Sequence, residues 1–210
     1  MIVAVDGPAA SGKGTIARAL AAHYGLPHMD TGLLYRAVAL NLLRWGGDPA
    51  DEREALRACD FSQIDFADAE LKSEAAGGIA SRISAFPLVR AALSKRQRDF
   101  AGQPGGAVLD GRDIGTVIAP EAEAKLFVTA RAEERARRRH EELKRMGLDV
   151  HYEDVLTDIR ARDERDANRD MAPLRMAEDA DLVDTSDTAI EVAIARAIEA
   201  VERRRAAARP

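Results

Sequence analysis

Short apolar runs and longer amphipathic segments alternate along the chain. The apolar runs predict strands at residues 2–5, 107–109, 125–128 and 181–183, with a short extended piece at 27–29. Between these runs, apolar residues recur every three to four positions, which is the period of one helix face. That period predicts helices at about 14–24, 33–45, 53–58, 79–84, 89–100 and 190–201, and charged helices on both sides of residue 147.

Strands that alternate with helices, in a chain that begins with a strand, favour an α/β fold with a parallel sheet and helices on both faces. In such sheets, ligands bind at the carboxyl ends of the strands. This rule brings the following segments to one edge of the predicted sheet: residues 7–15, 30–31, 110–113, 129 and 184–186. Functional residues are therefore expected in these segments.

Directly after the first predicted strand, the sequence has the spacing of a phosphate-binding loop. The loop consists of Gly7, Pro8, Ala9, Ala10, Ser11, Gly12, Lys13, Gly14 and Thr15. The glycines let the backbone curl until several N–H groups point at one anion, and Lys13 adds a positive charge for the outer phosphates. The helix that follows presents its positive end at the same place. A nucleoside triphosphate is the expected ligand, and a plain strand-to-helix turn is the alternative.

The residue after the lysine departs from the usual pattern. A serine or threonine there normally places its hydroxyl on magnesium, but here the residue is Gly14, and the hydroxyl comes one position later on Thr15. Mg²⁺ keeps several of its waters and needs few protein ligands. Thr15 and Asp110 are the candidate ligands, with Asp110 acting through water, and the sequence leaves direct ligation by the protein open.

The composition is that of an ordinary globular chain. Its 210 residues, of which 46% are hydrophobic and 32% charged, suffice for one well-buried core. The net charge of −5 argues against a nucleic-acid polymer or an anionic membrane as partner, because proteins that bind these carry a basic excess. Cys59 is the only cysteine, and neither a leader nor a membrane-spanning apolar run is present. We expect a cytoplasmic monomer.

The segment from Asp30 to Arg36 is open to two interpretations. Asp30 or Thr31 would cap the helix that follows, and Arg36 would then be one exposed helix residue. Alternatively, Thr31 and Arg36 would face the edge of the sheet and hold a phosphate. From this segment alone, the helix cap is the preferred interpretation.

A second polar segment, residues 110–113, places charges of both signs where a buried strand ends. There Asp110 would hold hydrated magnesium and Arg112 would neutralise an anion. A tight Asp-Gly turn with a surface ion pair is the alternative. The position after a buried strand favours function.

Arginines concentrate in two later segments. The first has Arg131, Arg135, Arg137, Arg138 and Arg139 among glutamates, and the second has Arg160, Arg162, Arg165 and Arg169 among aspartates. A solvated, ion-paired helix face explains most of these arginines. Two such helices also suggest a hairpin lid at about residues 130–170, which would close basic groups over phosphates and keep water out of phosphoryl transfer.

Several longer motifs are more specific than the loop. They are Val5-Asp6-Gly7-Pro8, Asp30-Thr31-Gly32 to Tyr35-Arg36, Phe86-Pro87 with Val89-Arg90 and Arg96-Gln97-Arg98, Asp110-Gly111-Arg112-Asp113-Ile114-Gly115-Thr116-Val117, and Arg162-Asp163 to Arg165-Asp166 with Asn168-Arg169. In these motifs, which cover most of the chain, the sequence resembles the bacterial cytidylate kinases of the nucleoside-monophosphate kinase group. The resemblance implies a P-loop NTPase-type fold, ATP with Mg²⁺ as phosphoryl donor and CMP or dCMP as acceptor.

The resemblance also implies roles for individual residues. Thr31, Arg36 and Arg112 would hold the acceptor phosphate; Ser81, Arg90 and Asp113, beside Gly111, would read the cytosine edge; Arg162 and Asp166 would lie near the sugar, and Arg169 near the phosphates. The implied catalytic residues are Lys13, Arg112, Asp113, Arg162 and Arg169. Cytosine is a chemically sensible base, because a carboxylate at Asp113 can accept from the exocyclic amine that uracil lacks.

The sequence departs from this family in two places. Thr31 stands where serine is usual, and it keeps the hydroxyl. Residues 61–78 are short and strand-poor where the family commonly carries a longer inserted small sheet. We therefore expect a reduced acceptor-binding insertion at about residues 46–85, within a single kinase domain that spans residues 1–210.

Two other functions stay open on the residues alone. The acceptor could be another nucleoside monophosphate or a shikimate-like metabolite, against which only the clusters at Arg90 and Asp113 argue. A nucleotide-binding switch without catalysis is the third possibility, although the Asn-Lys-x-Asp motif for guanine does not occur. Phosphoryl transfer suits the inventory best, because it needs positioning and charge neutralisation without a covalent nucleophile.

Overall fold

A computed structural model describes residues 1–62 and 64–207. These residues form two compact units, one made of Met1–Met29 and the chain from Ala101 onward, the other of Asp30–Phe100. The first unit contains the phosphate-binding loop. Within the part of the chain that is described, no helix is long and apolar enough to cross a membrane.

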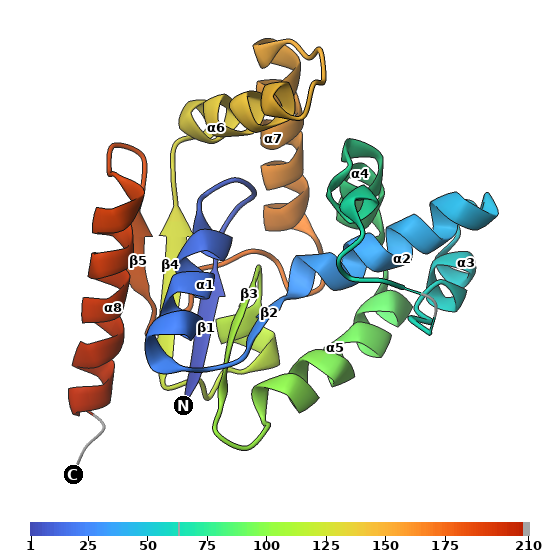
Figure 1. The fold of residues 1–210 in the computed structure, drawn as a ribbon. Helices are drawn as coiled ribbons and strands as arrows, with labels where there is room; N and C mark the ends of the chain where they lie inside the picture. Colours follow the sequence, from blue (N-terminus) through green and yellow to red (C-terminus); the bar gives the residue numbers. More distant parts are fainter. Residues whose placement is uncertain (63, 208–210) are drawn as a thin grey trace. The chain divides into compact units, whose positions relative to one another are not determined.

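The sheet has five strands in the order β2-β3-β1-β4-β5 (Figure 1). They are β1 (Ile2–Asp6), β2 (His28–Asp30), β3 (Ala107–Gly111), β4 (Ala124–Thr129) and β5 (Asp181–Asp184). β1 pairs in parallel with β3 and β4, and β4 pairs in parallel with β5. The strands predicted from the apolar runs are confirmed to within two residues at each end, and the parallel α/β architecture is confirmed with them.

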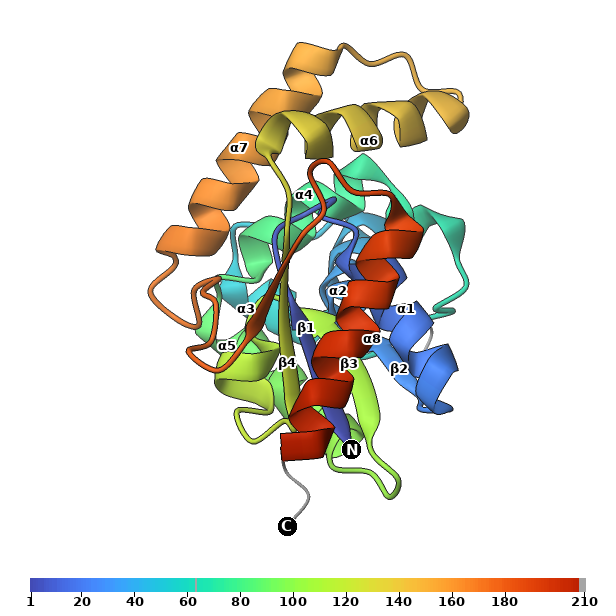
Figure 2. The same ribbon diagram turned by 90° about the vertical axis from the view of Figure 1, so that its left-hand side faces the viewer.

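Two helices of the first unit cover one face of the sheet (Figure 2). α1 (Lys13–Tyr24) contributes Ile16 and Leu20, and α8 (Ile190–Ala207) contributes Ala197 and Val201. These side chains pack on Val3, Val5, Val108, Leu126, Val128 and Val183 from four of the strands. Because side chains alternate between the faces of a strand, Lys125 points to the other face.

A short wide turn, η2 (Ile114–Ile118), lies on that other face, since a Cβ on Gly115 would meet the Lys125 side chain at 3.2 Å. Two more helices belong to the first unit, α6 (Ala132–Arg145) and α7 (Tyr152–Asn168). They pack against each other around a small core of Ala136, Leu143, Val155, Leu156 and Ile159. Both arginine-rich segments therefore form helices, as predicted.

The second unit is helical. It consists of α2 (Thr31–Trp45), α3 (Glu52–Arg57), the turn η1 (Ala69–Lys72), α4 (Glu74–Ile83) and α5 (Pro87–Ala101). Leu71 is buried against Ala37 and Leu40 of α2, with Phe61 and Ile64 around it. The Arg96 guanidinium lies over the Phe61 and Phe66 rings, 5.2 and 5.9 Å from their centroids. The described residues of 61–78 contain no strand.

Several helical elements differ from the sequence prediction: η1 was not predicted, and α8 continues to Ala207, beyond the predicted end at 201. α4 begins at Glu74, five residues earlier than predicted, because the Ser73 hydroxyl caps it by accepting from the Ala76 N–H. The Gly77-Gly78 pair hides this start, since glycine is a poor helix former. η2 has no apolar period of its own, and a contact with a distant residue, described below, accounts for it.

Candidate functional site

The backbone of the phosphate-binding loop curls tightly between β1 and α1. Gly7 has φ of +155° and Gly12 has φ of +88°, and Ala10 also adopts a left-handed conformation at +58°. A Cβ on Gly7 would collide with the Val128 carbonyl group. The Lys13 ammonium donates to the Pro8 carbonyl at 3.3 Å, which folds its side chain back along the loop. This geometry creates a pocket of N–H groups at the positive end of α1, which suits an anion.

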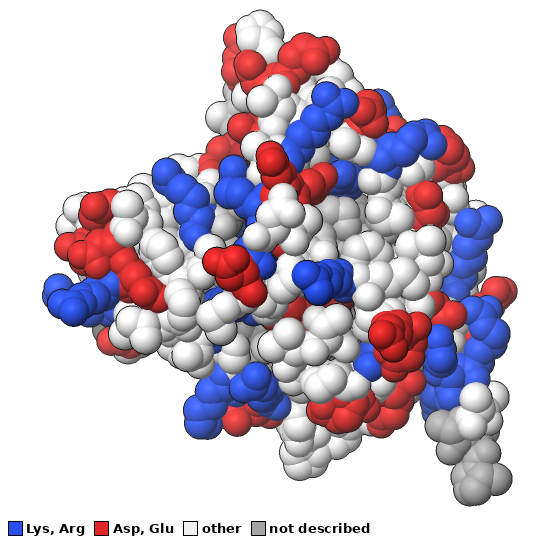
Figure 3. All heavy atoms as spheres, turned by 180° about the vertical axis from the view of Figure 1, so that it is seen from behind, with Lys and Arg blue, Asp and Glu red and all other residues white. Residues whose placement is uncertain are grey.

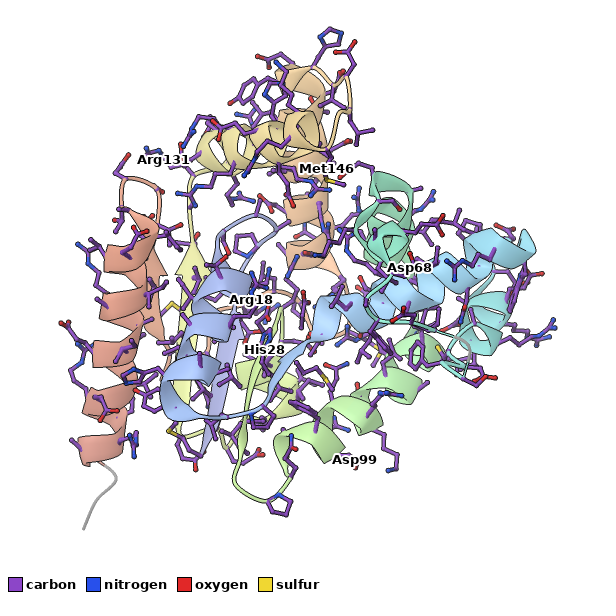
Figure 4. The ribbon with its side chains drawn as sticks, viewed as in Figure 1. Arg18, His28, Asp68, Asp99, Arg131 and Met146 are labelled. Atoms are coloured by element: carbon purple, nitrogen blue, oxygen red, sulfur yellow. The ribbon has the colours of Figure 1, made fainter. Side chains whose placement is uncertain are left out.

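A carboxylate from the next strand faces the start of α1. Asp110 is buried at the end of β3, and its Oδ1 lies 2.7 Å from Nε2 of His28. A Cβ on Gly14 would lie 3.6 Å from Asp110 Oδ2 and 3.5 Å from the Arg18 guanidinium. Arg18 projects from α1 and His28 stands at the beginning of β2 (Figure 4). The absence of a side chain at position 14 thus leaves the Asp110 carboxylate close to the loop.

The donor set fits a hydrated magnesium ion. Thr15 is exposed, and its hydroxyl accepts a 3.4 Å hydrogen bond from Arg18. In residues 1–62 and 64–207, no group of three or more His, Cys, Asp or Glu side chains is arranged to hold a metal. Mg²⁺ commonly uses one or two carboxylates together with substrate phosphates and waters. Asp110 supplies a carboxylate next to the phosphate-binding loop, and Thr15 supplies a hydroxyl within it.

The segment after β3 is buried and carries ion pairs. Arg112 Nε donates to Asp166 Oδ2 at 2.8 Å, and the Arg112 and Asp166 side chains are only 15% and 6% exposed. Arg112 also donates to the carbonyl of Gly111. Asp110 and Asp113 are both buried. The alternative of a surface Asp-Gly turn is therefore wrong, because these charges lie inside the protein.

Two more arginines complete this cluster. Arg169 lies 3.7 Å from Asp113, and its Nε donates to the Ala172 carbonyl. Burial alone would raise the pKa of Asp166, but the positive charges of Arg112, Arg162 and Arg169 outweigh it and hold that pKa below its usual value. The structure thus brings together five residues that the resemblance assigned to one site: Arg112, Asp113, Arg162, Asp166 and Arg169.

In the second unit, Thr31 and Arg36 stand on the first turns of α2. Asp30 occupies the cap position of α2, but its side chain makes no capping hydrogen bond. Asp30 is therefore the cap residue by position, as the preferred interpretation has it, but it does not cap the helix through its side chain. Thr31 is buried as the first residue of the helix. Arg36 donates to the carbonyls of Leu71 and Ser73, at 2.8 and 3.0 Å, and so ties α2 to the start of α4.

The two implied base-reading residues of the second unit belong to one buried network. Ser84 Oγ donates to the Ser81 carbonyl at 2.9 Å, and Arg90 donates to the Ser84 carbonyl at 3.3 Å. Arg90 also donates to the Tyr35 hydroxyl. Ser81, Ser84 and Arg90 are all buried. No sequence motif distinguishes Ser84 from an ordinary helix-end serine, so its part in the network was not predicted.

Most arginines of α6 form ion pairs at the surface, as predicted. Arg137 pairs with Glu134 and Glu141, and Arg139 pairs with Glu142. Arg131, at the start of α6 above the loop that precedes α8, makes a two-pronged pair with Asp187 (Figure 4). In the view of Figure 3, the basic side chains lie among acidic ones rather than in one continuous patch.

Arg135 is different, because its side chain is only 5% exposed. Its guanidinium donates to both oxygens of Asp163 on α7, to the Ala130 carbonyl and to the Ala9 carbonyl in the phosphate-binding loop. One side chain therefore joins α6, α7 and the loop. The sequence could not distinguish Arg135 from its neighbours, since all of them alternate with glutamates.

Beside the loop the first unit has a pocket of about 470 Å³. It is lined by Gly12, Thr15, Glu134, Arg137, Arg138, Thr185, Ser186, Asp187, Thr188 and Ile190. Arg138 donates to the Thr185 hydroxyl at 2.9 Å, and that hydroxyl donates to the Ser11 carbonyl. The position of residues 184–186 at this edge of the sheet was predicted from the rule for strand ends. The contribution of α6 side chains to the pocket was not predicted.

Comparison with known proteins adds independent findings. The family model described as cytidylate kinase matches residues 3–203. Proteins named cytidylate kinase from Xanthobacter autotrophicus and Methylocella silvestris are 58% and 55% identical to this chain, and the matches cover 98% and 96% of it and 99% and 94% of the relatives.

Solved structures resemble the chain in fold. A gluconokinase from Sinorhizobium meliloti has a TM-score of 0.53 at 15% identity, over 96% of this chain and 91% of its own. An uncharacterised protein from Eubacterium ventriosum has a TM-score of 0.57 at 14% identity, over 96% and 98% of the two chains. These likenesses agree with a P-loop NTPase-type α/β fold. With a loop for phosphates, a buried arginine and carboxylate cluster, and relatives that match nearly end to end, the chain belongs to the cytidylate kinase family.

Proposed function

We propose that the phosphate-binding loop holds ATP and that the cluster around Arg112 and Asp113 holds the acceptor in the reaction of this family. The chain transfers the γ-phosphoryl group of ATP to CMP or dCMP, giving ADP and CDP or dCDP. One observation carries the proposal: the loop follows β1, the cluster follows β3, and these strands are paired so that Asp6 lies opposite Gly111 (Figure 1). Groups that follow neighbouring parallel strands lie side by side.

On the donor side, backbone N–H groups of the loop bind the phosphates of ATP, and Lys13 neutralises the outer ones. The neighbouring pocket of about 470 Å³ accepts the adenosine, because it opens beside Gly12 and Thr15 where the phosphates begin. Its threonine and serine hydroxyls and its backbone groups suit a polar base edge. Binding of the adenosine orients the triphosphate along the loop.

Magnesium is the proposed cofactor. When bound to the donor phosphates, Mg²⁺ neutralises charge that develops during transfer. Asp110 would hold it through water, and Thr15 would lie near it. His28 holds the Asp110 carboxylate in place through the 2.7 Å contact, so that the other carboxylate oxygen faces the loop.

On the acceptor side, the proposed ligands of CMP are those that the family motifs imply. Arg112 binds its phosphate and Asp113 accepts from the cytosine amine, while Arg162, Asp166 and Arg169 lie near the sugar and phosphates. Thr31, Arg36, Ser81 and Arg90 complete the set. Burial of Asp113, Asp166 and Arg90 supports the assignment, since charged groups in a low-dielectric site discriminate strongly between ligands.

The region of α6 and α7, residues 132–168, is proposed to act as a lid over the phosphates. Arg135 supports this role, because its bonds to Ala9 and Asp163 would pass movement of α7 to the loop. A closed lid excludes water, which otherwise competes as acceptor. We also propose that the enzyme works as a monomer in the cytoplasm.

The direct test is the release of ADP from ATP and magnesium with CMP, dCMP, UMP, AMP or shikimate offered separately. We expect turnover with CMP and dCMP, slower turnover with UMP, and none with AMP or shikimate above the rate without acceptor. Comparable rates with AMP and CMP would remove the role of Asp113 in reading cytosine. ADP release independent of any acceptor would contradict phosphoryl transfer to a nucleotide.

A further inference from the structure

Asp6, the last residue of β1, directly precedes the phosphate-binding loop but has no role in the chemistry above. Its side chain is buried, and its residue is 5% exposed. Oδ1 accepts a 2.8 Å hydrogen bond from the N–H of Ile114, and Oδ2 accepts one of 2.8 Å from the N–H of Gly115. The carboxylate therefore spans from the start of the loop to the segment that follows Asp113.

The two N–H groups belong to the first turn of η2. Turns with this wide hydrogen-bond pattern are rare and concentrate at functional sites. Asp113 occupies the cap position of η2, but its own side chain makes no capping hydrogen bond. The carboxylate of Asp6 caps the turn instead, because it accepts hydrogen bonds from the N–H groups at the start of η2. The path of the backbone after Arg112 and Asp113 is consequently set by a residue of another strand.

The charges around Asp6 give no sign that its buried carboxylate stabilises the fold. Arg112 attracts its negative charge and Asp113 repels it, while the ammonium of Lys125, on the neighbouring strand β4, pairs with Asp179. Burial raises the pKa of Asp6 to about 6 in spite of the two backbone hydrogen bonds. A buried carboxylate is weak support for a fold. The burial of Asp6 is better explained by its role in ordering the segment that follows Arg112 and Asp113.

We propose that Asp6 is a positioning residue for the acceptor nucleotide, holding Arg112 and Asp113 in place beside the phosphate-binding loop through the N–H groups of Ile114 and Gly115. The inference rests on the proposed function, since it takes Arg112 and Asp113 as ligands of CMP. The hydrogen bonds of Asp6 reach the acceptor site through the backbone, because both of its oxygens accept from N–H groups.

The test compares the affinity for CMP with that for a non-hydrolysable ATP analogue, each by titration calorimetry. Asp6→Asn keeps the shape and one accepting oxygen, and Asp6→Ala keeps neither. We expect CMP to bind about tenfold more weakly to Asp6→Asn, and more weakly still to Asp6→Ala, with less than about a twofold change for the ATP analogue. Asp181→Asn, at the beginning of β5, is the matched control and should change neither affinity.

A second variant disturbs the same contact from the other side. A Cβ on Gly115 would lie 3.4 Å from Asp6 Oδ2 and 3.2 Å from the Lys125 side chain, so Gly115→Ala pushes the turn away from the carboxylate. We expect the same selective loss of CMP affinity. In the double variant with Asp6→Asn, the two losses should not add, because both remove one contact.

Thermal unfolding without nucleotide shows whether each variant is folded at the temperature of the titration. Equal losses for CMP and the ATP analogue would overturn the inference. So would a lower unfolding temperature with unchanged CMP affinity, which is the result expected of a purely structural residue. Asp113→Ala distinguishes failure of the acceptor assignment from failure of the positioning role of Asp6. If this variant leaves the CMP affinity unchanged, the acceptor assignment fails. If it weakens CMP and Asp6→Asn does not, only the positioning role fails.

Discussion

The phosphate-binding loop and the segment after β3 follow neighbouring strands, yet one relies on backbone groups and the other on side chains. The loop is a backbone structure, in which left-handed residues such as Gly12 turn N–H groups inward and Lys13 is the one charged side chain of residues 7–15. The segment after β3 depends on side chains, with Arg112 paired to Asp166 across 54 positions of sequence. A backbone site is encoded locally, whereas a side-chain site must be assembled by the fold.

The largest effect is expected from removing Lys13, whose charge is the only one that the loop contributes. Lys13→Ala should lower kcat by about a thousandfold or more, because transition-state charge on the transferred phosphoryl group loses a cation. The unfolding temperature without ATP should stay nearly constant, since the Lys13 side chain is no part of the core. A coupled assay of ADP release and a thermal melt measure both. A large drop in unfolding temperature would mean that Lys13 holds the loop together.

Arg135 tests whether the loop also needs a side chain. Arg135→Ala removes a buried cation that bonds Asp163 and the Ala9 carbonyl, so we expect a loss of about 3 kcal/mol in the free energy of unfolding. Arg137→Ala is the matched control on the same helix. Its side chain is 53% exposed, and its surface pairs should be worth less than about 1 kcal/mol. Urea unfolding of both variants checks the contrast, and equal losses would contradict it.

The pH dependence of stability tests the buried carboxylate that joins the two regions. The pKa of Asp6 is about 6 in the folded protein, whereas the ordinary pKa of an aspartate is 3.8, so the folded state holds this proton more tightly than the unfolded chain does. The contribution to stability is thus full below about pH 4 and is lost as the pH rises through 6, by about 3 kcal/mol in total.

Asp6→Asn removes that titration. As the pH rises from about 4.5 to 7, the wild type should therefore lose unfolding free energy relative to Asp6→Asn. Urea unfolding at several pH values in this range measures it. Parallel pH profiles for the two proteins would show that Asp6 does not titrate there.

The smallest effect concerns the acceptor side of the second unit. A Cβ on Gly77 would lie 2.8 Å from an Arg36 nitrogen, so Gly77→Ala forces the guanidinium away from the carbonyls that it bonds. Gly78→Ala is the control, because nothing lies within 4 Å of its Cβ. It should stabilise α4 by about 0.5 to 1 kcal/mol. We expect Gly77→Ala to be about 1 kcal/mol less stable than Gly78→Ala and to bind CMP more weakly. Equal stabilities in thermal unfolding, with equal CMP affinities, would show that Arg36 adjusts without loss.

The contrast between the two regions also explains what the sequence revealed. The strands and the loop were predicted correctly, because apolar runs and glycine spacing are local signals. The wide turn at Ile114–Ile118 was not predicted, since it depends on the carboxylate of Asp6, 108 positions away. Arg135 and Arg137 are equivalent in the sequence pattern, and only packing against α7 buries the first of them. The candidate acceptor residues came from family motifs, and their mutual contacts came from the fold.

The outer strand β5 has a consequence for how the molecules behave at high concentration. It is four residues long and begins and ends with an aspartate, and Asp181 is held by Arg203 and Arg204 of α8. An exposed strand edge is a template on which another copy can add by backbone pairing. Two β5 strands meeting edge to edge could share only a few backbone hydrogen bonds, because each strand is four residues long. The shortness of this outer strand therefore limits growth of the sheet from one molecule into the next.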